Sequence, residues 1–366
     1  MSGLQFGIFD WLDDSGRSLA EGYEQRLKML EYADRAGYFA YHLAEHHGTP
    51  LSTAPSPNLF FALLAQRTRR LRFGPMVYLL LKYHPVRLIE EICVLDQLSG
   101  GRLELGVGRP ASPFEAAIYG LDLTDSRPMT LEYLDLLTSA LATGRIDHEG
   151  KYFQLKDVRL TLRPLQRPYP PLWYPTLQAS SIPWIAQHGF HILLMFLFTS
   201  PEATGEQLRQ YRQLVREHAG QSGRLNGHVA EPLQGFSIQI YVADSDAEAR
   251  RVAREAHARF FHNFNYLWAQ NGVLDRHAAR ADFDHYVDQG MLAVGSPETV
   301  RATLQQYLDQ TGANYLAGCF SFGTLTDEQV LRSLELFTTQ VRPRLTAPDS
   351  NPPHPPAPSP TRGEGE

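Results

Sequence analysis

Hydrophobic positions along the chain change repeatedly between two spacings, and this change predicts strands and helices in turn. Residues 4–9 form a short apolar run that is typical of a buried strand. Residues 21–36 place apolar side chains at helical spacing until Gly37, a residue type that commonly ends a helix. The predicted strands cover residues 4–9, 38–43, 71–81, 102–107, 172–174, 192–194, 237–243 and 315–320. The predicted helices cover residues 21–36, 59–66, 86–98, 127–141, 202–218, 247–261, 297–310 and 327–341, with a further helix near Trp184.

Strands that alternate with helices in this way predict an α/β fold, specifically a parallel (β/α)8 TIM barrel rather than an open sheet. Two insertions interrupt the alternation, residues 144–171 after the fourth strand and residues 262–295 after the seventh. Within the first, residues 150–163 alternate as an inserted hairpin would. The Pro-rich end has no residue able to build a core. We therefore expect one barrel domain over residues 1–346 and a disordered tail over residues 347–366.

The composition is that of an ordinary globular protein and argues against several kinds of partner. The 366 residues are 43% hydrophobic and 20% charged, and the net charge is −6 without any run of Lys and Arg, so we expect no nucleic-acid partner. Only Cys93 and Cys319 occur, which favours a reducing compartment. The N-terminus does not resemble a signal peptide, and the longest apolar run, residues 192–198, is too short to cross a bilayer. These features predict a cytoplasmic protein without a membrane partner.

The segment His-Leu-Ala-Glu-His-His at residues 42–47 concentrates more proton-handling and metal-binding capacity than any other part of the chain. Imidazole titrates near neutral pH and is also the commonest metal ligand. In a barrel of this kind, chemistry is located on the loops that leave the C-terminal ends of the strands. Residues 42–47 follow the second predicted strand, Arg109 the fourth, residues 178–181 the fifth and residues 322–323 the eighth. We therefore expect these residues to meet at one face.

A metal site is the main alternative for the histidine segment. His42, Glu45 and His46 match the His-x-x-Glu-His pattern of a class of zinc peptidases, which would make the protein a zinc metallohydrolase. That pattern needs a helix, because only there do residues four apart lie above one another. Here the segment follows a helix-ending glycine and has the pattern of a strand, on which residues four apart are about 13 Å from each other. We therefore predict no metal site. In the simplest interpretation, His42 packs within its strand and His47 forms hydrogen bonds in a loop.

A phosphate site is predicted near the ends of strands four and five. Residues 106–110 contain two glycines after a strand, but the third glycine of a dinucleotide fingerprint is missing and Pro110 disrupts the expected helix. The planar, permanently charged Arg109 suits a phosphate or carboxylate. Ser181 either caps the helix that follows or contributes to an anion site at the helix start. Arg109, Arg127 and Ser181 together would form a reasonable phosphomonoester pocket.

Several short motifs together resemble those of the bacterial luciferase-like flavin monooxygenases, over residues 4–345. The motifs are Ala-Glu-His-His at 44–47, Ser-Pro-Asn at 56–58, Tyr-His-Pro-Val-Arg at 83–87, the segment 95–109, Val-Gly-Ser-Pro-Glu at 294–298 and Gly-Ala-Asn at 312–314. The resemblance implies an eight-stranded barrel that binds reduced FMN at its C-terminal face. It also implies reaction with O2, through a peroxyflavin, to oxygenate a small organic and lipophilic substrate.

The resemblance also implies partners and leaves alternatives open. Because the chain has no nicotinamide fingerprint, we expect a separate flavin reductase to supply reduced FMN. Family habit suggests a homodimer. The alternatives to an FMN-dependent monooxygenase are a deazaflavin-dependent oxidoreductase of the same fold, a non-catalytic FMN-binding protein and the zinc hydrolase described above.

Carried over residue by residue, the resemblance implies specific roles. His46 corresponds to the catalytic histidine, with Glu45 and His47 as further catalytic candidates. The implied cofactor-binding residues are Met76 and Val77 at a non-prolyl cis peptide under the flavin ring, Arg109 at the FMN phosphate, Glu115 near the flavin, and Arg127, Gln178, Ala179, Ser180 and Ser181 at further phosphate positions. The candidate apolar walls are Met76, Leu79, Leu81, Met195 and Phe196.

Two positions depart from the family pattern. Gly108 stands where bacterial luciferase has a reactive cysteine, and Gln178 stands where serine is usual. These departures argue against light emission and against long-chain aldehyde substrates.

Overall fold

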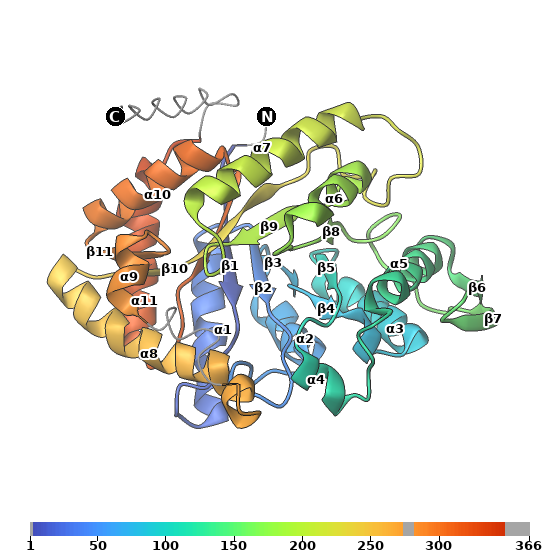
Figure 1. Ribbon diagram of the computed structural model, residues 1–366, viewed down its shortest axis with the longest axis horizontal. Coiled ribbons are helices and arrows are strands. Elements are labelled where there is room, and N and C mark those ends of the chain that lie inside the picture. Colours follow the sequence, from blue (N-terminus) through green and yellow to red (C-terminus); the bar gives the residue numbers. More distant parts are fainter. Residues whose placement is uncertain (1–2, 274–281, 348–366) are drawn as a thin grey trace, which may run out of the picture.

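The computed structural model describes residues 3–273 and 282–347, and its parallel strands form a closed barrel (Figure 1). The strands of the barrel are β1 (Gln5–Asp10), β2 (Ala40–Leu43), β3 (Arg72–Pro75), β5 (Leu105–Gly108), β8 (Leu172–Trp173), β9 (Ile192–Met195), β10 (Gln234–Val242) and β12 (Tyr315–Cys319). A continuous parallel ladder runs β9-β10-β12-β1-β2-β3, and β5 pairs with β8. Isolated parallel bridges, Phe73 to Leu103 and Trp173 to His191, join β5 to β3 and β8 to β9, which closes the ring. The predicted barrel is confirmed.

Helices surround the strands and cover the outside of the barrel (Figure 1). They are α1 (Leu19–Arg35), α2 (Pro57–Arg67), α3 (Pro85–Ser99), α4 (Pro113–Ile118), α5 (Ser126–Thr143), α6 (Ile182–His188), α7 (Pro201–Glu217), α8 (Asp246–Gln270), α9 (Phe283–Asp288), α10 (Pro297–Thr311) and α11 (Asp327–Leu336). Local sequence explains their ends. A capping box of Ser18 and Glu21 begins α1, and Gly100, in the left-handed region at φ 68°, ends α3.

The third predicted strand, residues 71–81, is wrong as a single element. The chain leaves β3 after Pro75, passes through the cis peptide bond Met76–Val77, and continues as β4 (Tyr78–Leu79) and a 3₁₀ turn, η1 (Leu80–Lys82). β3 pairs with β2, whereas β4 pairs with β5. The apolar run is typical of a strand, but nothing in it indicates that pairing changes from β2 to β5 part-way along the segment. The cis peptide expected at this position from the family resemblance is confirmed.

Both insertions contain regular structure. The first contains an antiparallel hairpin, as predicted, but it covers β6 (Arg145–Glu149) and β7 (Gln154–Arg159) rather than residues 150–163, and it projects from the body of the protein (Figure 1). In the second, α8 continues to Gln270 rather than ending at 261, and α9 and β11 (Leu292–Gly295) follow. The helix is longer than predicted because Phe260, Phe264 and Trp268 continue its spacing of four residues.

In residues 3–273 and 282–347, no helix has both the length and the apolar character needed to cross a bilayer. Cys93 and Cys319 are both buried free thiols. The cytoplasmic location stays a prediction. The predicted disordered tail falls on residues 348–366, outside the described residues.

Candidate active site

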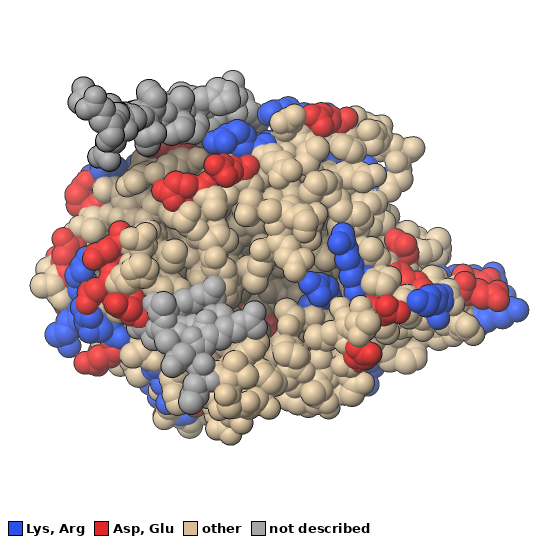
Figure 2. Space-filling model, viewed as in Figure 1, with Lys and Arg blue, Asp and Glu red and all other residues tan. Residues whose placement is uncertain are grey.

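A cavity of about 580 Å³ lies at the C-terminal ends of the strands, within the range usual for small-molecule sites. Its walls come from the segments that follow β1, β2, β3, β5, β8 and β9, and from the second half of α8. Figure 2 shows a hollow at the centre of this face, surrounded mainly by uncharged residues. His46, Met76, Val77, Arg109 and Glu115 all line the cavity. The structure therefore brings these sequence-predicted residues together at one face.

Glu115 connects two basic side chains at the cavity wall. Nδ1 of His46 lies 2.8 Å from Oε1 of Glu115, and Nζ of Lys82 donates to Oε2 at 2.9 Å. Ser112 caps α4 by accepting a hydrogen bond from the backbone N–H of Glu115, which holds this residue in the first turn of the helix. The Lys82 and Glu115 side chains are only 1% and 5% exposed, whereas that of His46 is 29% exposed. His46 is therefore the member of this group that a ligand can reach.

The electrostatics of Glu115 keep its carboxylate ionised. Burial alone would raise the pKa of Glu115, but the hydrogen bond and charge of His46, together with the Lys82 ammonium, outweigh it and lower the pKa to about 2. A permanent carboxylate at Nδ1 orients the His46 ring. Nε2 then remains as the ring nitrogen that can exchange a proton with a ligand in the cavity.

Glu45 and His47 are held by contacts within the protein. The buried Glu45 carboxylate accepts hydrogen bonds from the Tyr83 hydroxyl at 2.8 Å and from the backbone N–H of Leu79 at 3.3 Å, and Nε2 of His47 lies 2.8 Å from it. Nδ1 of His47 lies 2.8 Å from the Tyr119 hydroxyl. Both ring nitrogens of His47 are thus occupied. These contacts favour a positioning role for Glu45 and His47, which fix the loop after β2 against β4.

His42 belongs to the barrel core. Its side chain is fully buried, with Nε2 2.8 Å from the Tyr315 hydroxyl and the ring edge-on to Trp173. Burial lowers the pKa of His42 to about 3, so the ring stays neutral. His42 lies in β2 and His46 in the loop after it, so the His-x-x-Glu-His segment is not helical. Across residues 3–273 and 282–347, His, Cys, Asp and Glu side chains form no group of three or more that could hold a metal ion.

A cationic region lies at one end of the cavity. Arg109 lines the cavity, and Arg127 is exposed in the first turn of α5. Burial raises the pKa of Tyr174, which follows β8, and the charges of Arg109 and Arg127 both oppose that rise. The two arginines therefore lie near the same tyrosine, at the same part of the rim.

The predicted phosphate turn lies just outside the cavity wall. Gln178, Ala179 and Ser180 are exposed. Ser181 makes no side-chain hydrogen bond that caps α6, so of its two alternatives the cap is wrong. Residues 175–177, which immediately precede this turn, line the cavity. A role for residues 178–181 toward a phosphate stays a prediction.

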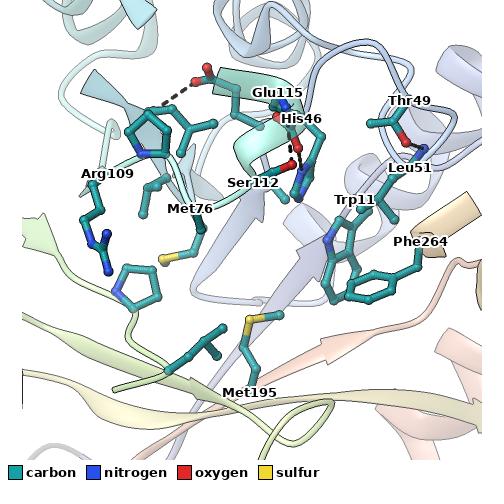
Figure 3. A pocket seen from close by; sticks show the side chains of 18 of the residues that line it. Trp11, His46, Thr49, Leu51, Met76, Arg109, Ser112, Glu115, Met195 and Phe264 are labelled. Atoms are coloured by element: carbon teal, nitrogen blue, oxygen red, sulfur yellow. Dashed lines mark hydrogen bonds and ion pairs between the residues drawn. The ribbon is translucent and has the colours of Figure 1, made fainter. Parts of the chain in front are cut away.

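The opposite end of the cavity is apolar. In Figure 3, Arg109 lies at one end, Trp11 and Phe264 lie at the other, and Met76 and Met195 lie between them. Of the candidate walls, Met76, Leu79 and Met195 line the cavity. The other two do not line it: Leu81 packs against the hydrophobic core, and Phe196 is fully buried and stacks on Phe236.

Sequence reasoning missed several residues of the site. Lys82 was not singled out, and neither were the apolar lining residues Trp11 and Leu51; Phe264, Leu267 and Trp268 lie in the insertion 262–295, which was expected to shape the pocket. The available signals were weak. The aromatic density of residues 260–268 marked α8 as unusual, and Lys82 is a charged residue directly after an apolar run.

The donor set of this cavity suits a flavin nucleotide. A guanidinium at one end can bind a phosphate, and apolar side chains between the ends can pack against a flat ring system. His46 adds a side chain that can donate or accept a proton at the cavity wall.

Comparison with known proteins identifies the family. Residues 4–315 match the model of the family described as luciferase-like monooxygenase. The chain belongs to this family. The predicted family and enzyme class, a flavin-dependent monooxygenase, are thereby confirmed.

Three relatives illustrate the range of this luciferase-like family. The chain is 38% identical to the uncharacterized protein y4wF of Sinorhizobium fredii over 324 residues, which cover 88% of this chain and 92% of the relative. It is 28% identical to 4-hydroxyprotoasukamycin monooxygenase of Streptomyces nodosus subsp. asukaensis over 353 residues (94% and 93%). It is 26% identical to the oxygenase component of flavin-dependent trigonelline monooxygenase of Acinetobacter baylyi over 282 residues (76% and 72%).

Solved structures show the same fold with two kinds of cofactor. The oxygenating constituent of 3,6-diketocamphane monooxygenase of Pseudomonas putida, in complex with FMN, has a TM-score of 0.79 at 23% identity, covering 95% of this chain and all (100%) of that chain. The coenzyme F420-dependent tetrahydromethanopterin reductase of Methanopyrus kandleri has a TM-score of 0.68 at 16% identity, with 94% and 100% covered. At such identities these similarities concern the fold alone.

Proposed function

We propose that this luciferase-like protein is the oxygenase component of a two-component monooxygenase that uses reduced FMN and O2 to oxygenate a small lipophilic substrate. The observation that carries this proposal is the arrangement of one cavity, with Arg109 at a cationic end, Trp11 and Phe264 at an apolar end, and His46 on its wall. Reduced FMN, when bound, supplies the two electrons with which one oxygen atom of O2 enters the substrate and the other becomes water.

Each part of the cavity has a defined task in this proposal. Arg109 binds the phosphate, with Arg127 and residues 178–181 as further phosphate contacts at the same rim. Met76 and Val77 form the wall under the flavin ring. The apolar side chains exclude water, which protects reactive species from hydrolysis and from loss of protons.

Proton handling falls to His46 in this proposal. The Glu115 carboxylate at Nδ1 orients the ring, and Nε2 then gives or takes the proton on the cavity side. Glu45 and His47 support the loop that carries His46.

A separate reductase would supply the reduced flavin. Two observations support this part: the chain has no nicotinamide-binding fingerprint, and the trigonelline relative is named an oxygenase component. The purified chain with FMN and NADH should therefore consume no NADH until a flavin reductase is added. Oxidation of NADH by the chain alone would contradict a two-component system.

A homodimer forms part of the same proposal. Large apolar side chains are exposed at spacings of four residues on two helices that pack against each other, namely Leu59 and Leu63 on α2, and Val94 and Leu98 on α3. Exposed apolar side chains on two packed helices are typical of an interface, and a twofold axis would place the same surface of two copies together.

The decisive experiment compares FMN with riboflavin, which lacks the phosphate. Arg109→Ala should weaken the binding of reduced FMN by about 10- to 100-fold, since a charge-assisted hydrogen bond contributes about 1.5–3 kcal/mol, and leave riboflavin binding unchanged. Arg145→Ala, in the hairpin away from the cavity, is the matched control. If Arg109→Ala bound FMN as tightly as the wild type does, Arg109 would not be part of a phosphate site.

Two further outcomes of that titration separate the alternatives. Tighter binding of a reduced deazaflavin than of reduced FMN would favour the deazaflavin-dependent oxidoreductase. FMN binding without O2-dependent conversion of any substrate in a broad panel would favour the non-catalytic protein.

A further inference from the structure

A second, much smaller cavity adjoins the main one inside the mouth of the barrel. It measures about 10 Å³, which is about the room that one water-sized sphere occupies. Phe9 and Trp11 line both cavities, so the two cavities are neighbours that share these two side chains. The remaining wall includes Ser237, Gln239 and Cys319.

Strand register places this small cavity next to the main one. Ser237 of β10 pairs with Met195 of β9, which lines the main cavity, and Gln239 pairs with Cys319 of β12. Residues two apart on a strand share a face, so Ser237 and Gln239 present their side chains to the same side of β10. This side is the inner wall of the barrel, because the paired Met195 lines the main cavity.

Gln239 has a buried amide group without a partner. The residue is 4% exposed, and neither its side-chain nitrogen nor its oxygen has a hydrogen-bond partner within the part of the chain that the structure describes. Buried polar atoms in native proteins are nearly always hydrogen-bonded, so an amide with both atoms unpaired indicates that a ligand atom or a water completes it. The NH2 group can donate to a carbonyl oxygen, and the amide oxygen can accept from a hydroxyl group.

The small cavity suits an uncharged group. None of its described lining residues is charged, so a charged ligand group would lose its hydration without gaining a counter-charge. The one titratable lining group, the Cys319 thiol, is held neutral because burial raises its pKa well above the usual value. The volume also limits the ligand to about one oxygen atom at this position.

We propose that Gln239, assisted by Ser237, binds an uncharged oxygen function of the substrate, a hydroxyl or carbonyl group, in the small cavity that shares Trp11 with the main one. This inference rests on the proposed function, because the apolar body of the substrate then occupies the end of the main cavity lined by Leu51 and Phe264. The Trp11 ring packs edge-on against Phe9 and Phe260, at centroid distances of 4.5 and 5.1 Å.

The test compares two probes that differ only in the oxygen function. Benzyl alcohol and toluene are titrated against the full chain by ligand-observed NMR, for the wild type and for Gln239→Leu. Loss of one neutral hydrogen bond should weaken benzyl alcohol binding by roughly 3- to 10-fold, while toluene binding stays within about twofold. Leu51→Ala, at the apolar end, is the matched control and should weaken both probes alike.

Other results would overturn the proposal. If Gln239→Leu changes both probes equally or neither, the amide serves the fold or a bound water and not the substrate. If Gln239→Leu does not fold, as judged by circular dichroism, the same titrations are done with Gln239→Met and Ser237→Ala. A selective loss of benzyl alcohol binding again supports the proposal, and its absence overturns it.

A parallel titration of reduced FMN separates this inference from the proposed function. If FMN fails to bind while Gln239→Leu still removes the preference for benzyl alcohol, the subsite stands and the proposed function is wrong. If FMN binds while Gln239→Leu changes the binding of both probes equally or of neither, the proposed function stands and the subsite is wrong.

Discussion

Nδ1 of His46 lies 2.8 Å from Oε1 of Glu115, although 69 residues separate them in the sequence. His46 follows β2 and Glu115 lies in α4, after β5, so the barrel brings the two side chains together at its C-terminal rim. Because Lys82 donates to the other oxygen of the same carboxylate, Glu115 is held from two sides. The position of Glu115 therefore determines the orientation of the His46 ring.

Replacing His46 should remove catalysis and leave flavin binding intact. His46→Ala deletes the group that exchanges the proton, and general acid–base catalysis typically contributes about 100- to 10,000-fold in rate. We expect a fall of that size in substrate oxygenation, measured with an added flavin reductase, and an FMN dissociation constant within about threefold of the wild type. His84→Ala, an exposed histidine before α3, is the matched control. Wild-type turnover in His46→Ala would exclude His46 from the reaction.

Replacing Glu115 should change the pH dependence of the rate. Glu115→Gln keeps a hydrogen-bond acceptor but removes the negative charge beside Nδ1 of His46. The pH–rate profile should therefore change shape, and the maximal rate should fall by about 10-fold. A purely structural role would lower the amount of folded enzyme and leave the shape of the profile unchanged. The pH–rate profiles of the two proteins decide between these roles.

The barrel, and the face of it on which His46 and Arg109 lie, could be predicted from the sequence, because both depend on local patterns. A change from strand spacing to helical spacing is visible within a few residues, and the end of a strand in a parallel barrel has a known location. His46 and Arg109 each follow the end of a predicted strand, which puts both at the same face. The pairing of Lys82 with Glu115 was not predictable in this way, because it depends on how the chain turns after β4.

The candidate walls of the cavity show why apolar residues are harder to assign. Met195 and Phe196 are neighbours at the end of β9, and both were expected to line the cavity. Only Met195 does, while Phe196 stacks on Phe236. Successive side chains of a strand point to opposite faces, so only one of the two can face the barrel interior. The sequence shows that both are apolar, but which of them faces inward depends on the register between strands.

Glu115 should also make stability depend on pH in the acid range. Its pKa in the folded protein is lowered to about 2 from an ordinary value of 4.5. The stabilisation is therefore fully present above pH of about 4.5 and is lost as pH falls toward 2, since the unfolded state takes up the proton first. A shift of this size corresponds to something on the order of 3 kcal/mol. Urea unfolding of the wild type and Glu115→Gln should show a difference at pH 6 that narrows at pH 3, and a constant difference would contradict this account.

The exposed apolar face of α2 and α3 should determine the oligomeric state. Leu63→Lys together with Leu98→Lys would place charges within the proposed twofold interface, where their desolvation is unfavourable. Light scattering coupled to size exclusion should then report twice the chain mass for the wild type and the single chain mass for the double variant. Leu165→Lys, which replaces a similarly exposed leucine in a loop rather than on α2 or α3, is the control. A monomeric wild type would contradict the homodimer.

Asn263 should determine how α8 closes the apolar end of the cavity. Its fully buried amide donates to Oδ2 of Asp13 at 3.0 Å and to the backbone oxygen of Asp14 at 2.8 Å. One and four residues further along α8, Phe264 and Leu267 line the cavity. Anchoring Asn263 to the segment after β1 therefore fixes the wall against which the substrate packs.

Asn263→Ala leaves the buried Asp13 carboxylate without one of its donors. Burial raises the pKa of Asp13 to about 6, and the Asn263 hydrogen bond opposes that rise. We expect a loss of about 1–3 kcal/mol in unfolding free energy, and a KM for the substrate that rises several-fold as α8 loosens. FMN affinity should stay near the wild-type value, because Arg109 lies at the opposite end of the cavity. Asn271→Ala, whose exposed amide donates to the backbone oxygen of Leu267 in its own helix, is the control. An unchanged KM in Asn263→Ala would mean that the anchor serves stability alone.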